Sequence, residues 1–272
     1  MIFRNLSFLL FMGVMAVHIW VRDTSWMTSP ENTLPIIIAL PLFVWLGSPW
    51  KLRSTPLPLP PGGLITGASG YILGLLLDIA LLLAAGWVCL LWAWISSRME
   101  QDTLPRIRRL MVLPVLAFPW LSTEGDAVGW YFRITGAWAT AEIFSSMGFN
   151  VLHEGTRIIV QGLPVGVGEA CSGMNVLQSM LIAGSALAFL FIGRYRSYWW
   201  NIPVLVIIAW LANTSRIIIL CAAALTLGSE FALGIFHTWG GWIVLVLMLF
   251  LSWTVFSAQE SYLRKTATPS SA

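Results

Sequence analysis

Apolar runs of about 20 residues recur along this 272-residue chain, and they constrain its fold more than any other feature. Each run can cross the hydrocarbon core of a bilayer, because about 20 helical residues span its thickness of ~30 Å. Charged residues make up 10% of the chain, against about 25% in a soluble domain. The sequence therefore predicts an all-α polytopic membrane protein, a bundle of about 7–8 transmembrane helices.

The apolar runs give approximate positions for these helices. The stretch 64–97 can form one long tilted helix or a tight pair of short ones, and Asp78 is its one acidic residue. No small-residue cleavage site follows the first run, so we expect a retained helix rather than a removed signal peptide. The other expected spans lie at about 5–21, 34–50, 110–122, 172–192, 202–226 and 238–257.

The segment between the expected spans at 110–122 and 172–192 has a different pattern. Residues 123–147 interleave apolar and polar side chains, which predicts a short amphipathic helix. Residues 148–170 alternate weakly around Glu154 and Gly155, which predicts a small β-hairpin. Both are expected outside the bilayer. The apolar residues assigned to the amphipathic helix are Val128, Phe132, Trp138, Ile143, Phe144 and Met147.

The basic residues orient the chain, because loops rich in Lys and Arg stay in the cytoplasm. Such clusters occur at 106–109, 194–196 and 264–265. Placing all three in the cytoplasm puts 123–171 and 227–237 on the outer side. Lys51, Arg53 and Arg98 also favour the cytoplasm, and this requires an even number of crossings between them, which favours two within 64–97.

Three reactive side chains lie at the boundaries or inside the last three spans. Cys171 lies in EACSG, Arg216 in NTSR and His237 in GIFH. Cys171 is expected to open a helix whose polar stripe continues through Asn175 and Gln178, then Ser179 and Ser185. Ionisable groups at membrane depth are costly and usually face a bundle interior. The other two cysteines, Cys89 and Cys221, lie within apolar runs and read as buried packing residues.

Each of these residues also has a structural interpretation. Arg216 could snorkel toward the interface, His237 could be a polar boundary residue, and the stripe could serve helix–helix contact. Taken together, however, they compose a candidate nucleophilic site. A helix N-terminus and a nearby cation favour a thiolate at Cys171. His237 could protonate the leaving amine, and Arg216 could hold an oxyanion or a substrate carbonyl.

The order and spacing of these motifs resemble the exosortase/archaeosortase family of membrane transpeptidases. EACSG, NTSR and the FH dipeptide match its cysteine, arginine and histidine motifs over about 110–257. His237 points to the bacterial exosortase branch, since an arginine is common there in the archaeal branch. The resemblance divides the chain into N-terminal helices (1–109), a catalytic membrane core (110–257) and a disordered cytoplasmic tail (258–272).

The resemblance implies a cysteine peptidase or transpeptidase in the bacterial inner membrane, with its active site on the periplasmic side. Its substrates would be secreted proteins that end in a sorting motif, often Pro-Glu-Pro, followed by an apolar helix and a basic tail. Cys171 would form a thioester, and an acceptor such as a lipid or polysaccharide, or water, would resolve it. Glu169, Ser172, Asn175 and Asn213 would bind substrate or support Cys171, Arg216 and His237. No metal, cofactor or nucleic acid is expected.

Two other functions are compatible with the residues. A transporter or an assembly subunit for exported polysaccharide would use polar groups at membrane depth as a pathway, and Asp78 favours this. A serine protease could use Ser172, but Ala170 occupies the position of the glycine in the Gly-x-Ser pattern.

Overall fold

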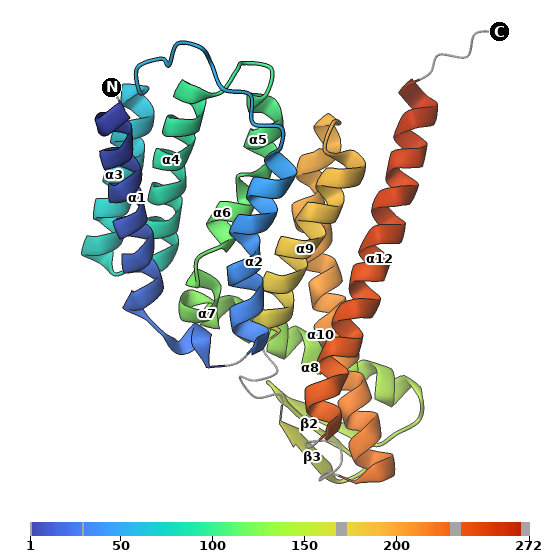
Figure 1. The fold of residues 1–272 in the computed structure, drawn as a ribbon. Helices are drawn as coiled ribbons and strands as arrows, with labels where there is room; N and C mark the ends of the chain where they lie inside the picture. Colours follow the sequence, from blue (N-terminus) through green and yellow to red (C-terminus); the bar gives the residue numbers. More distant parts are fainter. Residues whose placement is uncertain (1, 29, 167–172, 229–234, 268–272) are drawn as a thin grey trace, which may run out of the picture. The chain divides into compact units, whose positions relative to one another are not determined.

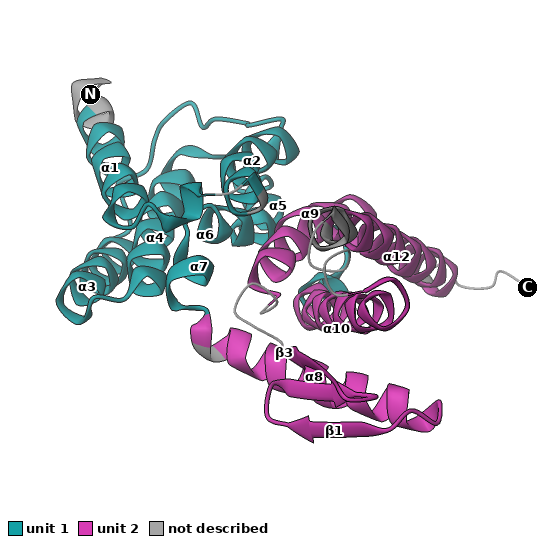
Figure 2. Ribbon diagram, turned by 90° about the horizontal axis from the view of Figure 1, so that it is seen from below, with its two compact units in different colours: residues 1–125, 193–199 teal, residues 126–192, 200–272 magenta. Residues whose placement is uncertain are grey.

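A computed structural model of the chain describes residues 2–28, 30–166, 173–228 and 235–267 (Figure 1). The chain divides into two compact units, which Figure 2 colours separately. Unit 1 comprises Met1–Gly125 with Gly193–Trp199, and unit 2 comprises Asp126–Ile192 with Trp200–Ala272. These units are defined by contacts and the sequence-based boundary at 109/110 by motifs, so that boundary stays a prediction.

Unit 1 begins with helices α1 (Ile2–Arg22) and α2 (Pro30–Gly47), which the short 3-10 turn η1 (Ser25–Met27) separates. Helix α1 packs on α4 (Ala80–Arg98). Their contact is apolar, with one polar anchor where the indole Nε1 of Trp87 donates to the carbonyl of Met12 at 2.8 Å. Buried methionines and aromatic side chains, including Phe118, fill the space between these helices.

The stretch 64–97 forms a tight helical pair, the second of the two predicted arrangements. Helix α3 (Pro61–Leu77) ends at Asp78, whose φ of 60° and ψ of 37° turn the chain back into α4. Glycines allow the two backbones to touch. A Cβ on Gly74 would lie 2.7 Å from the backbone nitrogen of Leu83, and one on Gly86 would overlap the backbone of Tyr71. Close packing through small residues is typical of membrane helices.

The prediction of a continuous span at 110–122 is wrong. This region contains three short helices, α5 (Leu104–Leu110), α6 (Val112–Leu116) and α7 (Trp120–Glu124). Pro119 precedes α7 and supplies no amide hydrogen to a helix continuing from α6, and Pro114 lies inside α6. A proline inside an apolar run breaks or kinks a helix for this reason.

Basic segments gather at one end of unit 1. The amide of Arg53 donates to the carbonyl of Arg98 at 2.8 Å, and Arg106 donates to the carbonyl of Leu46 at 2.9 Å. Arg109 donates to the carbonyl of Gly193, which precedes Arg194. Segments that the positive-inside rule assigns to one side of the membrane therefore lie together at one end.

Unit 2 contains three long helices that pack on one another, α9 (Met174–Ile192), α10 (Asn201–Leu227) and α12 (Ile235–Ala267) (Figure 1). The 3-10 turn η3 (Arg196–Trp200) leads into α10. Helix α12 continues to Ala267, so the segment 258–267 is helical and does not belong to a disordered tail. Buried Gln178, Ser185 and Ser252 show that polar groups are enclosed within this unit.

Helix α8 (Asp126–Ser146) confirms the predicted helix but corrects its buried face. Phe132 and Phe144 are buried as expected, whereas four other predicted apolar residues are exposed: Val128, Trp138, Ile143 and Met147. Small residues make up most of the buried face instead, because α8 approaches α10 closely. A Cβ on Gly136 would lie 3.0 Å from Cδ1 of Ile217.

The predicted hairpin is present within a three-stranded antiparallel sheet, in the order β1 (Val151–Glu154), β2 (Arg157–Val160) and β3 (Leu163–Gly166). The sequence analysis missed β3. Ile158 and Val160 of β2 are fully buried against Ile217 and Cys221 of α10. The sheet thus lies against α8 and α10 (Figure 2).

Four helical segments in the described residues are long and apolar enough to cross a membrane: Ala80–Arg98, Met174–Ile192, Arg196–Leu227 and Trp242–Thr266. Shorter apolar helices occur at Ser7–Arg22, Asn32–Gly47 and Pro61–Leu77. The fold is that of a mostly helical, polytopic membrane protein with a small sheet. The expected number of about 7–8 spans stays a prediction.

Candidate active site

The arginine and histidine motifs lie on α10 and α12 of unit 2, and Gly173, the last residue of the cysteine motif, directly precedes α9. Arg216 lies within α10, and His237 lies in the first turn of α12, where the structure describes its backbone. Glu169, Cys171 and Ser172 lie outside the described residues, and the description resumes at Gly173 of the same EACSG motif. Since α9, α10 and α12 pack on one another, the fold brings the elements that carry these motifs together.

Gly173 provides the closest described link between two of the motifs. A Cβ at this residue would lie 2.7 Å from Cγ and 2.9 Å from Oδ1 of Asn213, in NTSR. Gly173 also has a φ of 77°, a conformation that side chains with a Cβ rarely adopt. Only glycine meets both conditions without strain. The residue two positions after Cys171 therefore lies against the residue three positions before Arg216.

Helix α9 begins at Met174, after Gly173, and not at Cys171 as the sequence analysis expected. The carbonyl of Gly173 accepts the first helical hydrogen bond from Leu177, at 2.8 Å. The described polar stripe is otherwise arranged as predicted. Gln178 and Ser185 are buried, and Asn175 and Ser179 are partly buried.

Arg216 is enclosed by protein. Its side chain is 8% exposed and Asn213 is fully buried, which disfavours a side chain that snorkels along the surface of a helix. Thr214, between them in sequence, is also buried. An enclosed arginine is expensive unless its surroundings are polar or charged. This burial favours a functional interpretation of Arg216.

The contact with Gly173 locates Arg216 along α10. From Asn213 the helix continues to Leu227, about 20 Å beyond the point where α9 begins, at 1.5 Å per residue. This extension is the part that α8 and the sheet cover, through Ile217 and Cys221. Arg216 therefore lies where the long-helix bundle meets the sheet.

The sequence analysis missed the residues of α8 that pack against α10 near Arg216. Gly136 of α8 approaches Thr214 Oγ1 and Ile217, which lie two residues before and one residue after Arg216. The fully buried side chain of Thr140 lies one turn further along α8 and donates to the carbonyl of Gly136 at 2.7 Å. The small residues at 136, 137, 140 and 141 were the available sequence signal, because they are spaced for one helix face.

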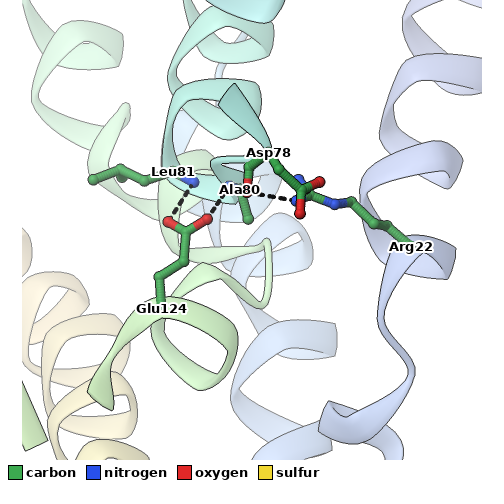
Figure 3. A network of polar contacts seen from close by, with 5 residues as sticks. All are labelled: Arg22, Asp78, Ala80, Leu81 and Glu124. Carbon is green, nitrogen blue, oxygen red and sulfur yellow. Dashed lines mark hydrogen bonds and ion pairs between the residues drawn. The ribbon is translucent and has the colours of Figure 1, made fainter. Parts of the chain in front are cut away.

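Asp78 lies in unit 1, at the exposed turn between α3 and α4 and not within a span. Its carboxylate forms an ion pair with Arg22, and its carbonyl accepts from the same guanidinium at 2.6 Å (Figure 3). Beside this turn, Glu124 of α7 accepts from the backbone amides of Ala80 and Leu81, the first residues of α4 (Figure 3). A carboxylate at a helix N-terminus satisfies free amides and favours the helix dipole. These are structural roles, so Asp78 no longer favours a transport pathway.

The fold and the helix contacts define a polytopic membrane protein in which α10 and α12 carry the arginine and histidine motifs and pack on α9, which begins directly after the cysteine motif. The family model for transmembrane exosortase (Exosortase_EpsH) matches residues 26–254. This chain belongs to the transmembrane exosortase family. The match includes α2, α3 and α4, where no motif was recognised from the sequence. A comparison with curated proteins and one with solved structures found no match.

Proposed function

We propose that this protein is a membrane cysteine peptidase or transpeptidase that cleaves a C-terminal sorting signal from secreted proteins. Family membership supports a membrane transpeptidase role in general. Cys171 is the proposed nucleophile, Arg216 the proposed electrostatic group and His237 the proposed acid and base. Glu169, Ser172, Asn175 and Asn213 are the proposed supporting residues.

The contact between Gly173 and Asn213 carries this proposal. It links EACSG and NTSR, which are 40 residues apart in sequence, at the start of α9. A helix N-terminus favours an anion, because its free amides and dipole are positive. A buried guanidinium on the neighbouring helix strengthens that preference, because the charge acts where water is largely excluded. These conditions favour a thiolate and an oxyanion over their neutral forms.

The reaction proceeds in two steps. The Cys171 thiolate attacks the carbonyl carbon of the scissile peptide bond, and Arg216 stabilises the negative charge on its oxygen. The C–N bond then breaks, and the departing amine takes a proton from the His237 imidazolium, which leaves a thioester. An acceptor amine, hydroxyl or water gives a proton to neutral His237 and attacks the thioester carbonyl, and the thiolate leaves.

The site would face the periplasm of a bacterial inner membrane. This orientation rests on Arg194 and Arg196, which follow α9, and on Arg264 and Lys265 at the end of α12, all of which would lie in the cytoplasm. A substrate held by its own helix diffuses in two dimensions and presents its motif at the membrane surface, close to where α9 begins. The proposed substrates carry a Pro-Glu-Pro-like motif, an apolar helix and a basic tail. The proposed acceptor is a lipid or polysaccharide.

Co-expression with a tagged secreted protein tests the proposal directly. The substrate should end in the Pro-Glu-Pro motif, apolar helix and basic tail, and come from the same genome. We expect wild type to release the helix and tail, and Cys171→Ala to abolish release. Rapid acid quenching and mass spectrometry should detect the substrate on Cys171 as a thioester that hydroxylamine removes.

Cys89→Ala is the matched control, because it removes a thiol from α4 in unit 1. It should process substrate as wild type does. Equal processing by the Cys171→Ala protein would refute the proposed mechanism and leave EACSG as a helix boundary. Processing that serine-directed reagents block and thiol reagents do not would instead identify Ser172 as the nucleophile.

A further inference from the structure

Strand β3 is the edge of the sheet nearest in sequence to the proposed nucleophile. Among the described residues it pairs with β2 alone. Cys171 lies five positions after Gly166, its last residue, a distance of at most ~17 Å for an extended chain. A peptide that paired with this edge would therefore have its next few residues within reach of the thiol.

The register determines which backbone groups of β3 point outward. The turn at Gln161 and Gly162, with φ of 53° and 82°, connects Val160 to Leu163 as a two-residue hairpin. Val160 pairs with Leu163, and Ile158 with Val165, so Leu163 and Val165 form the hydrogen bonds to β2. The amide of Gln161 donates to Asn150 on the β1 side at 2.9 Å, which fixes the same alternation. The backbone polar groups of Pro164 and Gly166 thus point away from β2, toward the open edge of the sheet.

The outward side of β3 offers few backbone polar groups, and these do not bond to β2. Proline has no amide hydrogen, and its position on the outer side is the one an edge strand tolerates. Within the part of the chain that the structure describes, the carbonyl of Pro164 and both the amide and the carbonyl of Gly166 remain for a partner. Among the described residues nothing lies within 4 Å of a Cβ built on Gly166. The available groups are concentrated at the end of β3 that leads to Cys171.

A cationic side chain, that of Arg157, lies opposite Gly166 on the neighbouring strand. Arg157 is the β2 partner of Gly166, and its side chain is exposed. Within the described part of the chain it forms no ion pair. Since Gly166 has no side chain, the guanidinium can extend over it toward an added strand about 10 Å from β2. An acidic side chain opposite Gly166 would lie on the same face of the sheet and complement Arg157.

We propose that an extended segment of the substrate adds to the edge of β3 as a fourth strand, with an acidic residue opposite Gly166. This inference rests on the proposed function and specifies how that site recognises its substrate. Strand addition supplies affinity through backbone hydrogen bonds, and side chains supply specificity. Every second substrate amide would point to β3, and the amides between them would point away. Residues at the latter positions can be proline without loss of binding.

Binding to the Cys171→Ala protein in lipid nanodiscs separates recognition from chemistry. The probe is a fluorescent peptide with the sequence of the sorting segment, N-methylated in turn at each residue other than proline. We expect alternate positions to weaken binding by about five-fold or more, the loss of one hydrogen bond, and the positions between them to have little effect. Pro164→Ala adds an outward amide to the edge and should tighten binding by about three-fold.

Arg157→Gln should weaken binding by about three-fold, and changing the acidic residue of the peptide to Gln should cause the same loss. The two changes together should cost no more than either alone. Arg264→Gln is the control, because it removes a charge from the far end of α12 in the same unit. Uniform losses from N-methylation, or no peptide binding while wild type cleaves the full substrate, would overturn strand addition and leave the proposed function intact. Failure of wild type to cleave would overturn the proposed function itself.

Discussion

The α3–α4 hairpin of unit 1 and the α9–α10–α12 bundle of unit 2 are both packed helices, but they enclose different groups. The hairpin brings glycines against the opposing backbone, and its charged residues Asp78 and Arg98 lie at its ends. The bundle encloses Asn213, Arg216 and Gln178. The polar groups that the hairpin buries, such as Ser97 and the indole of Trp87, are neutral, whereas the bundle must satisfy a charged arginine and two amides.

This difference distinguishes the helices that we expect to provide stability alone from those that we expect to take part in the reaction. A hairpin held by close backbone contact gains dispersion energy at little desolvation cost. A bundle that encloses an arginine loses stability unless the arginine is satisfied, and such a cost is usually tolerated for function. Changes in the hairpin should therefore alter stability alone, and changes in the bundle should alter activity more than stability.

The largest effect is expected for Arg216→Lys in the bundle. Lysine keeps the charge but lacks the planar guanidinium with its fixed donors. We expect the rate of substrate cleavage to fall about 100-fold or more, as for the loss of one oxyanion donor, with little change in the melting temperature. Arg264→Lys, at the exposed end of α12, should leave both unchanged. A large drop in melting temperature with an unaltered rate per folded molecule would reverse our assignment of the bundle.

A smaller effect, on stability alone, is expected for Gly86→Ala in the hairpin. The added methyl group would overlap the backbone of Tyr71 in α3, so the helices must separate. Overpacking of this kind costs about 1–3 kcal/mol, and thermal unfolding in detergent, followed by tryptophan fluorescence, should detect it. Gly62→Ala is the control, since among the described atoms nothing lies within 4 Å of its Cβ. Equal melting temperatures for the two variants would argue against close helix contact.

The smallest effect is expected for Glu124→Gln at the junction of α7 and α4. The amide oxygen can accept one of the two backbone hydrogen bonds, but the charge that favours the N-terminus of α4 is lost. We expect a loss of about 0.5–1 kcal/mol in the free energy of unfolding. Asp78→Asn is the comparison, because its side chain is 88% exposed and such ion pairs contribute about 0–1 kcal/mol. Asparagine also tolerates the left-handed turn there. A larger loss in the free energy of unfolding for Asp78→Asn would show that the ion pair with Arg22 stabilises the α3–α4 hairpin more than Glu124 does.

The sequence predicted features that depend on local composition. The run at 64–97 allowed one long helix or a pair, and the basic residues on either side of it favoured the pair. Alternation around Glu154 and Gly155 indicated the first two strands. Hydrophobicity alone did not reveal where prolines break an apolar run. Residues 110–122 are apolar enough to be predicted as a span, but Pro114 and Pro119 divide the region into short helices. The third strand was not predicted, and its Pro164 is a residue that a sheet accepts on the outer side of an edge strand.

The candidate site was predictable as a set of motifs and not as a geometry. The spacing of EACSG, NTSR and GIFH predicted which helices form the proposed site. It did not predict that Gly173 contacts Asn213, since that contact depends on how α9 and α10 pack 40 residues apart. The buried face of α8 was also misassigned, because close helix contact selects small residues where an amphipathic pattern suggests large ones.

The proline on the outer side of β3 has a consequence for encounters between copies of this protein. Proteins in one membrane meet often, and two exposed sheet edges readily join into a continuous sheet. Pro164 withholds one of the two outward amides of β3, so two such edges that met would lack donors on both sides. The same residue that shortens the edge available to a guest peptide thus opposes self-association through the sheet.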